Sequence, residues 1–136
     1  MAVGDVPNVY SVGVHNVGSY QVSGIPYITG STSLAAGAEE KITFPYVTRT
    51  ITVVNHSSHK LRISFNATGS GNVVGGCHFV ELDSDEDSFS FNVKCKEIYV
   101  SSDPASGGAI EYRLVAEMTN IPAARMYDLT GSGLTD

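Results

Sequence analysis

The chain has 136 residues, of which 42% are hydrophobic and only 16% are charged, so it is long enough for one domain with its own core and too short for two ordinary ones. Its formal net charge is −6, and its 8 Lys and Arg residues form no basic stripe for nucleic acid or for an anionic membrane surface. The apolar runs are a few residues long, so we expect no membrane span, and the first residues show no secretion signal.

The chain divides by texture into three parts. Residues 1–36 are rich in Gly, Val, Ser and Tyr without a clean amphipathic pattern, and we expect an extended N-terminal arm or edge strands there. Residues 37–120 are expected to form the core domain. Residues 121–136 carry Pro122 and two alanines near their start, which permits one short helical turn before a flexible tail.

Alternation of apolar and polar residues predicts strands from residue 38 onward. Ile42 and Phe44 alternate with polar neighbours, and Pro45 should end that strand or place it at an edge. Residues 50–53 and 60–65 also alternate and flank a short polar turn. Two such strands joined by a short turn predict a β-hairpin.

The second half of the chain continues the pattern. Residues 83–87 predict an acidic turn and residues 88–93 the strand that follows it. The apolar parity then shifts at Ile98, which indicates a turn or bulge near residues 94–97, because a pleated strand does not otherwise change faces. Residues 110–118 are the longest clean alternation and predict the longest strand.

Seven or more short strands with almost no helix predict an all-β fold, a β-sandwich or jelly-roll-like pair of antiparallel sheets. The outward positions of these strands carry Ser, Thr and Asn more often than Lys and Glu. An isolated monomer usually carries more surface charge, so this composition favours a protein packed among neighbours.

The sequence contains no pattern typical of an active site, so we expect no catalytic, cofactor or metal residues. It has no Gly-x-Ser-x-Gly pentapeptide. His56 and His59 are expected to be solvated turn residues, and the acidic cluster at 83–87 lacks the glycine of a calcium loop. Cys77 and Cys95 are too few for a disulfide scaffold and are expected to be reduced, buried thiols.

Five stretches spread over nearly the whole chain carry a family resemblance. They are Gly18-Ser-Tyr-Gln-Val-Ser-Gly-Ile-Pro-Tyr-Ile-Thr-Gly-Ser31, Phe44-Pro-Tyr-Val-Thr48, Thr52-Val-Val-Asn55, Val93-Lys-Cys-Lys-Glu-Ile-Tyr-Val100 and Leu129-Thr-Gly-Ser-Gly-Leu-Thr-Asp136. In these stretches the chain resembles a family of small virion structural proteins of marine tailed phages, notably those that infect cyanobacteria. These motifs indicate a family by their sequence, but they contain no catalytic or ligand-binding pattern that would indicate a mechanism.

The resemblance implies a non-enzymatic virion component that is made in the host cytoplasm. The first expectation is a capsid decoration, or cement, protein, a small β-rich domain that binds the major capsid protein on the outside of the shell, often as a trimer. The alternative is a tail or fibre component, either an adaptor or a host-receptor-binding module. Neither nucleic acid nor membrane is an expected partner.

Aromatic and apolar residues near the two ends of the chain are the interface candidates, because aromatic side chains dominate the energetics of interfaces. The alternative is that they cover an open end of the core within their own chain. They are Tyr10, Tyr20, Tyr27 and Ile28 in the N-terminal part, and Tyr127 and Leu129 in the C-terminal part.

Overall fold

The computed structural model describes Val14, residues 24–67, 76–84, 86–103, 105 and 107–130, and Leu134. These residues form an all-β structure, as the alternation predicts. Its elements in chain order are β1 (Ile25–Leu34), β2 (Glu39–Thr43), β3 (Tyr46–Asn55), β4 (Leu61–Ser64), β5 (Val80–Leu82), β6 (Ser88–Phe91), β7 (Glu97–Ser102), β8 (Ile110–Pro122) and the 3-10 turn η4 (Ala123–Arg125).

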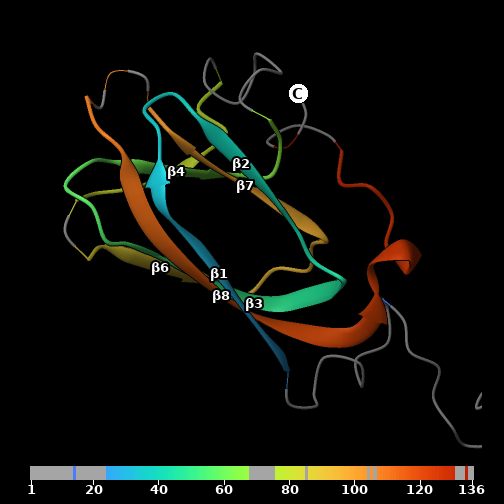
Figure 1. Ribbon diagram of the computed structural model, residues 1–136. Coiled ribbons are helices and arrows are strands. Elements are labelled where there is room, and N and C mark those ends of the chain that lie inside the picture. The colour runs from blue at the N-terminus through green and yellow to red at the C-terminus, as the bar shows by residue number, and fades with distance from the viewer. Residues whose placement is uncertain are drawn as a thin grey trace, which may run out of the picture.

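The strands form two antiparallel four-stranded sheets that pack as two layers (Figure 1). Sheet A has the order β1-β8-β3-β6, and sheet B has the order β2-β7-β4-β5. The pairing is nested, because β1 pairs with β8, β2 with β7, β3 with β6 and β4 with β5. The predicted β-sandwich is therefore confirmed, and Ile25–Leu34 lies within it as the edge strand of sheet A.

The core lies between the two sheets. It is formed by every second residue of each strand, whose side chain points inward. Tyr112 is the largest fully buried side chain, and its hydroxyl donates a hydrogen bond to Glu40 Oε1 at 2.8 Å. Burial, followed by the neighbouring Glu40 carboxylate, raises the pKa of Tyr112 above its ordinary value. The other fully buried large side chains are Phe44, Val47, Ile51, Val53, Leu61, Ile98, Val100, Ile110, Leu114 and Ile121.

The hairpin predicted between residues 50–53 and 60–65 is wrong. β3 pairs with β6 and β8 in sheet A, whereas β4 pairs with β5 and β7 in sheet B, so the connection crosses between the layers. Asn55, which is fully buried, holds this crossing. Its Nδ2 donates to the carbonyl oxygens of His59 at 2.7 Å and Asp83 at 2.8 Å, and its Oδ1 accepts from Ser57.

The predicted irregularity near residues 94–97 is confirmed, because β6 ends at Phe91 and β7 begins at Glu97 in the other sheet. The Thr48 side chain fastens the crossing segment to β3. Its Oγ1 donates to the Val93 carbonyl oxygen at 2.8 Å and accepts from the Cys95 amide at 3.1 Å. Pro45 separates β2 from β3, as predicted, and β8 is the longest of the described strands.

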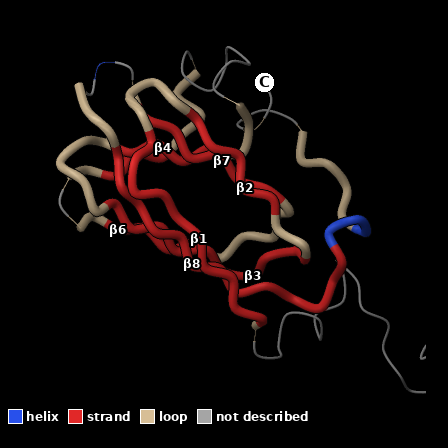
Figure 2. The backbone as a smooth tube through the Cα atoms, viewed as in Figure 1, coloured by secondary structure: helices blue, strands red, loops and turns tan. Residues whose placement is uncertain are grey.

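A second, smaller cluster of buried residues closes one end of the sandwich. It consists of Val14, Val47, Ile121 and Met126, with Leu129 packed against it. The predicted short helical turn is η4, which lies directly beyond β8 and is coloured blue in Figure 2. Val14 is the described part of the first 23 residues, and it packs onto its own chain here.

We expect Leu114→Ala to lower the free energy of unfolding by about 2–5 kcal/mol, because it leaves a cavity between the sheets. Leu114 is fully buried, whereas its neighbour in β8, Val115, is 42% exposed. The control Val115→Ala should change stability by less than about 1 kcal/mol. Urea denaturation measures both values, and equal losses would contradict the assigned inward face of β8.

Candidate functional site

The two neighbouring interface candidates of β1 point to opposite faces of sheet A. Tyr27 is half-buried, and its ring meets that of Phe44 edge to face with 5.2 Å between the ring centroids. Ile28 is 70% exposed, the largest exposed fraction among the exposed large hydrophobic residues. Tyr27 thus covers its own core, and Ile28 is available to a partner.

The C-terminal candidates divide in the same way. Tyr127 is 52% exposed just after η4. Leu129 is half-buried and packs against both core clusters. Tyr10 and Tyr20 lie outside the described residues.

Ile28 belongs to a cross-strand row on the outer surface of sheet A. The row runs from Ile28 in β1 to Val115 in β8, Thr52 in β3 and Ser90 in β6, which are register partners in turn. Its two apolar members lie side by side, and the Thr52 and Ser90 hydroxyls are hydrogen-bonded at 2.8 Å. No member of the row is charged, so covering it removes no charge from water.

Arg113 lies beside this row, and its guanidinium contacts acceptors of its own chain. Its Nη2 lies 3.0 Å from Glu111 Oε1, and its Nη1 donates to the carbonyl oxygens of Tyr112 and Ser31. Gly30 makes room for this arrangement, because a Cβ at position 30 would collide with the Tyr112 carbonyl oxygen. The guanidinium is thereby directed at acceptors along β1.

The hydrogen-bond parity of sheet A shows which backbone groups its β6 edge presents. The amide of Asn55 donates to the carbonyl oxygen of Asp87 at 2.9 Å, so odd-numbered residues of β3 face odd-numbered residues of β6. Neighbouring residues of a strand direct their N–H and C=O groups to opposite sides. Ser88 and Ser90 therefore present these groups away from β3.

The same reasoning applies to the β1 edge. The amide of His56 donates to the carbonyl oxygen of Glu111, so even-numbered residues of β3 form backbone hydrogen bonds with odd-numbered residues of β8. The even-numbered residues of β8 therefore direct their backbone groups toward β1. Their register partners in β1 are odd-numbered, so β1 bonds β8 through its odd-numbered residues. Ile28 and Gly30 therefore present N–H and C=O groups outward. Pro26 is at an outward position too, where its missing N–H breaks no bond to β8.

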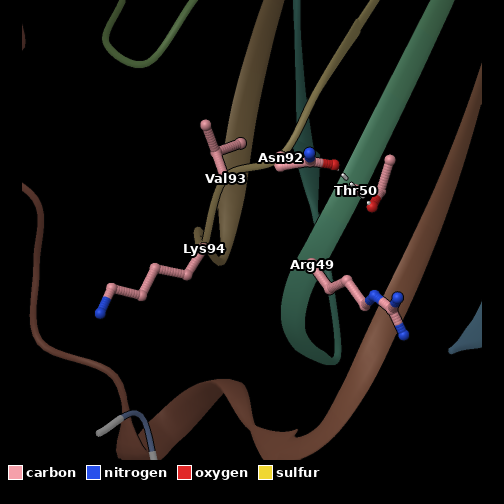
Figure 3. Close-up of a pocket in the computed structure, with 5 residues that line it drawn as sticks. All are labelled: Arg49, Thr50, Asn92, Val93 and Lys94. Atoms are coloured by element: carbon pink, nitrogen blue, oxygen red, sulfur yellow. Dashed lines mark hydrogen bonds between the residues drawn. The ribbon is translucent and has the colours of Figure 1, made fainter. Parts of the chain in front are cut away.

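A surface pocket of about 500 Å³ lies at one end of β6. Figure 3 shows the side chains that line it, two from β3 and three from the segment that follows β6. Thr50 Oγ1 donates to Asn92 Oδ1 at 3.1 Å across the gap between these segments. The lining residues are Arg49, Thr50, Asn92, Val93 and Lys94, so the pocket carries two cationic side chains and no acid.

The other end of β6 is acidic. The predicted turn at residues 83–87 connects β5 to β6, and its Glu86 Oε1 lies 2.5 Å from the Nδ1 of the exposed His56. Between its two ends β6 is uncharged and carries Phe89, which is 40% exposed. Edge strand β6 thus runs from an acidic turn to the two cations of the pocket.

The two cysteines have different environments. Cys95 is fully buried against Thr48, and burial raises the pKa of its thiol to about 11. The expectation that Cys77 is buried is wrong: this thiol is exposed, because the residue sits in a turn before β5 with a positive φ of 60°. Both thiols are free.

Within the part of the chain that the structure describes, no three His, Cys, Asp or Glu side chains gather as metal ligands. No helix among those same residues is long and apolar enough to cross a membrane. Comparison with known proteins yields no matching family model, no matching curated protein and no matching solved structure.

The folded protein should show one thiol that reacts quickly with an aromatic disulfide reagent at pH 8, and a second that reacts only after denaturation. The raised pKa keeps Cys95 protonated at that pH, and burial blocks access to it. Cys77→Ala should abolish the fast phase. Two equally fast thiols in the native protein would contradict the buried position of Cys95.

Proposed function

We propose that this protein is a non-enzymatic virion structural protein that binds the outside of a phage capsid as a decoration, or cement, protein. The observation that carries the proposal is edge strand β1. It is ten residues long and uncharged, and it combines outward backbone groups with the exposed Ile28. Soluble monomers usually protect such an edge with charges, prolines or bulges, or cover it; β1 has no charge, and its proline and register interruption lie toward its two ends, at Pro26 and between Ser31 and Leu34. An edge of this kind therefore favours a protein whose working state is an assembly.

The fold agrees with this role. The nested pairing of two four-stranded antiparallel sheets supports a jelly-roll-like arrangement, an architecture that viral capsid domains, lectins and cupins share. Architecture alone does not specify function. Among the functions that this architecture has, we prefer the virion role because of the family resemblance of the sequence.

The uncharged cross-strand row on the outer surface of sheet A supplies a physical mechanism. A capsid subunit that covers Ile28 and Val115 gains apolar burial without removing a charge from water. An extended segment of that subunit gains further hydrogen bonds by adding to the outward groups of β1. Because such contacts form only on the assembled shell, they stabilise that state by mass action.

The partner in this proposal is the major capsid protein, and the particle surface is the site of action. A trimer at a local three-fold position is the arrangement that the resemblance implies. A tail or fibre component would use the same domain on another part of the particle. Cryo-electron microscopy of the intact virion separates the two, since decoration places this chain at symmetry-related positions over the shell.

Purified protein should co-sediment with undecorated capsid shells and not with isolated tails, and Ile28→Lys should weaken shell binding by about tenfold or more. If the shell buries Ile28, a lysine at this position loses about 1.5–3 kcal/mol of the free energy gained from that apolar burial. Val80→Lys is the matched control, because Val80 is 42% exposed on the edge strand of the other sheet. Binding to tails alone would turn the proposal toward host attachment.

The arm candidates need a separate test that spares the sandwich. β1 begins at Ile25, so deleting residues 1–23 removes Tyr10 and Tyr20, together with Val14 of the second buried cluster, and leaves every described strand in place. The truncated protein should keep its far-ultraviolet circular dichroism spectrum and lose affinity for shells. Unchanged co-sedimentation would show that these tyrosines are not anchors.

A further inference from the structure

Edge strand β6 is complementary to a second copy of itself. We propose that two copies of this chain pair antiparallel through β6, about a two-fold axis at Ser90, and so join two A sheets into one. A contact of this symmetry uses the same surface on both chains, so every feature must match its own partner. The backbone and aromatic groups of β6, and the charged residues that flank it, each meet this condition.

The backbone is suitably directed. Ser88 and Ser90 present their N–H and C=O groups away from β3, and among the described residues no other strand pairs with β6 on that side. With the axis at Ser90, each residue lies opposite the one equally far along the partner strand. The two Ser90 residues then exchange a pair of hydrogen bonds, and Ser88 lies opposite Asn92 of the second copy.

The same register brings the aromatic residues together. Phe89 lies opposite Phe91 of the second copy at a position without ladder hydrogen bonds, where facing side chains are closest. Within one chain the Phe89 and Phe91 ring centroids are already 5.3 Å apart, and the Phe91 and Phe65 centroids are 6.0 Å apart. Pairing extends this cluster across the axis and covers Phe89, which is 40% exposed in the single chain.

The charges agree with this register as well. Glu86 lies just before β6 and Lys94 just after it, so antiparallel pairing of β6 brings the acidic turn of each copy toward the cationic end of the other. That end is the pocket of about 500 Å³ whose lining includes both Arg49 and Lys94. Glu86 is exposed next to His56, and Lys94 is exposed too. Two such contacts form by symmetry.

The other edge of sheet A is less suited to this pairing. In β1, Pro26 lacks an outward donor, and the register is interrupted between Ser31 and Leu34. Among the described residues, β6 contains neither a proline nor an interruption. Pairing through β6 leaves β1 open to a different partner, so the inference does not depend on the proposed binding to a shell.

Light scattering coupled to gel filtration tests the pairing in the full-length protein. Ser90→Pro removes an outward N–H without breaking a backbone hydrogen bond between β3 and β6, and it removes the exposed hydroxyl contact of Ser90 with Thr52, so the fold should persist. We expect the wild-type mass to be twice that of this variant, with unchanged circular dichroism. Phe89→Ser should raise the dissociation constant about tenfold, whereas Val80→Ser, at a similarly exposed position in sheet B, should leave it unchanged.

A charge exchange tests the register itself. Lys94→Glu should weaken pairing about tenfold, because two attractive contacts become repulsive. Adding Glu86→Lys to the same chain should restore the wild-type dissociation constant, which a role confined to one chain would not produce. A monomeric wild type, a mass that Ser90→Pro does not reduce, or a double variant that pairs no better than Lys94→Glu would each overturn the proposal.

Discussion

The buried amide of Asn55 holds the point at which the chain leaves one sheet for the other. Its hydrogen bonds to Ser57, His59 and Asp83 satisfy a polar group that would otherwise be costly to bury between two apolar layers. Its backbone also bonds to Glu86 and Asp87. One residue thus fixes both the crossing after β3 and the turn before β6, and with them the acidic end of that edge strand.

Thr48 has the matching role at the opposite end of β6. Its hydroxyl fastens residues 93–95 to β3, so that the strand stops after four residues and Lys94 is carried to the surface beside Arg49. The core that these two polar residues enclose is largely apolar, and its Tyr112 hydroxyl is satisfied by Glu40. The arrangement of charge on the edge of sheet A is therefore a consequence of how the chain crosses between layers.

Alternation in the sequence identifies the strands well, because a half-buried strand must place apolar residues at every second position. It also identifies the irregularity at residues 94–97. It cannot identify partners, because pairing is long-range and depends on which sheet a strand joins. The hairpin prediction failed for that reason, since Leu61 and Ile63 alternate equally well in either sheet. The outward position of Ile28 was within reach of the sequence, whereas the pocket beside Lys94 depends on Arg49, 45 residues earlier in the chain.

The two edge strands of sheet A suit different binding partners, and the few charged residues near them contribute to this difference. β1 combines an exposed isoleucine with a proline that limits symmetric pairing, so it suits a partner of another sequence. β6 is bounded by opposite charges, so it suits an antiparallel copy and repels a parallel one. With a net charge of −6 the chains repel at long range, and in the proposed pairing the contacts between acidic turn and cationic pocket offset part of that repulsion. In the proposed pairing the few charges at the ends of β6 favour one register, because other registers do not bring the acidic turn to the cationic pocket.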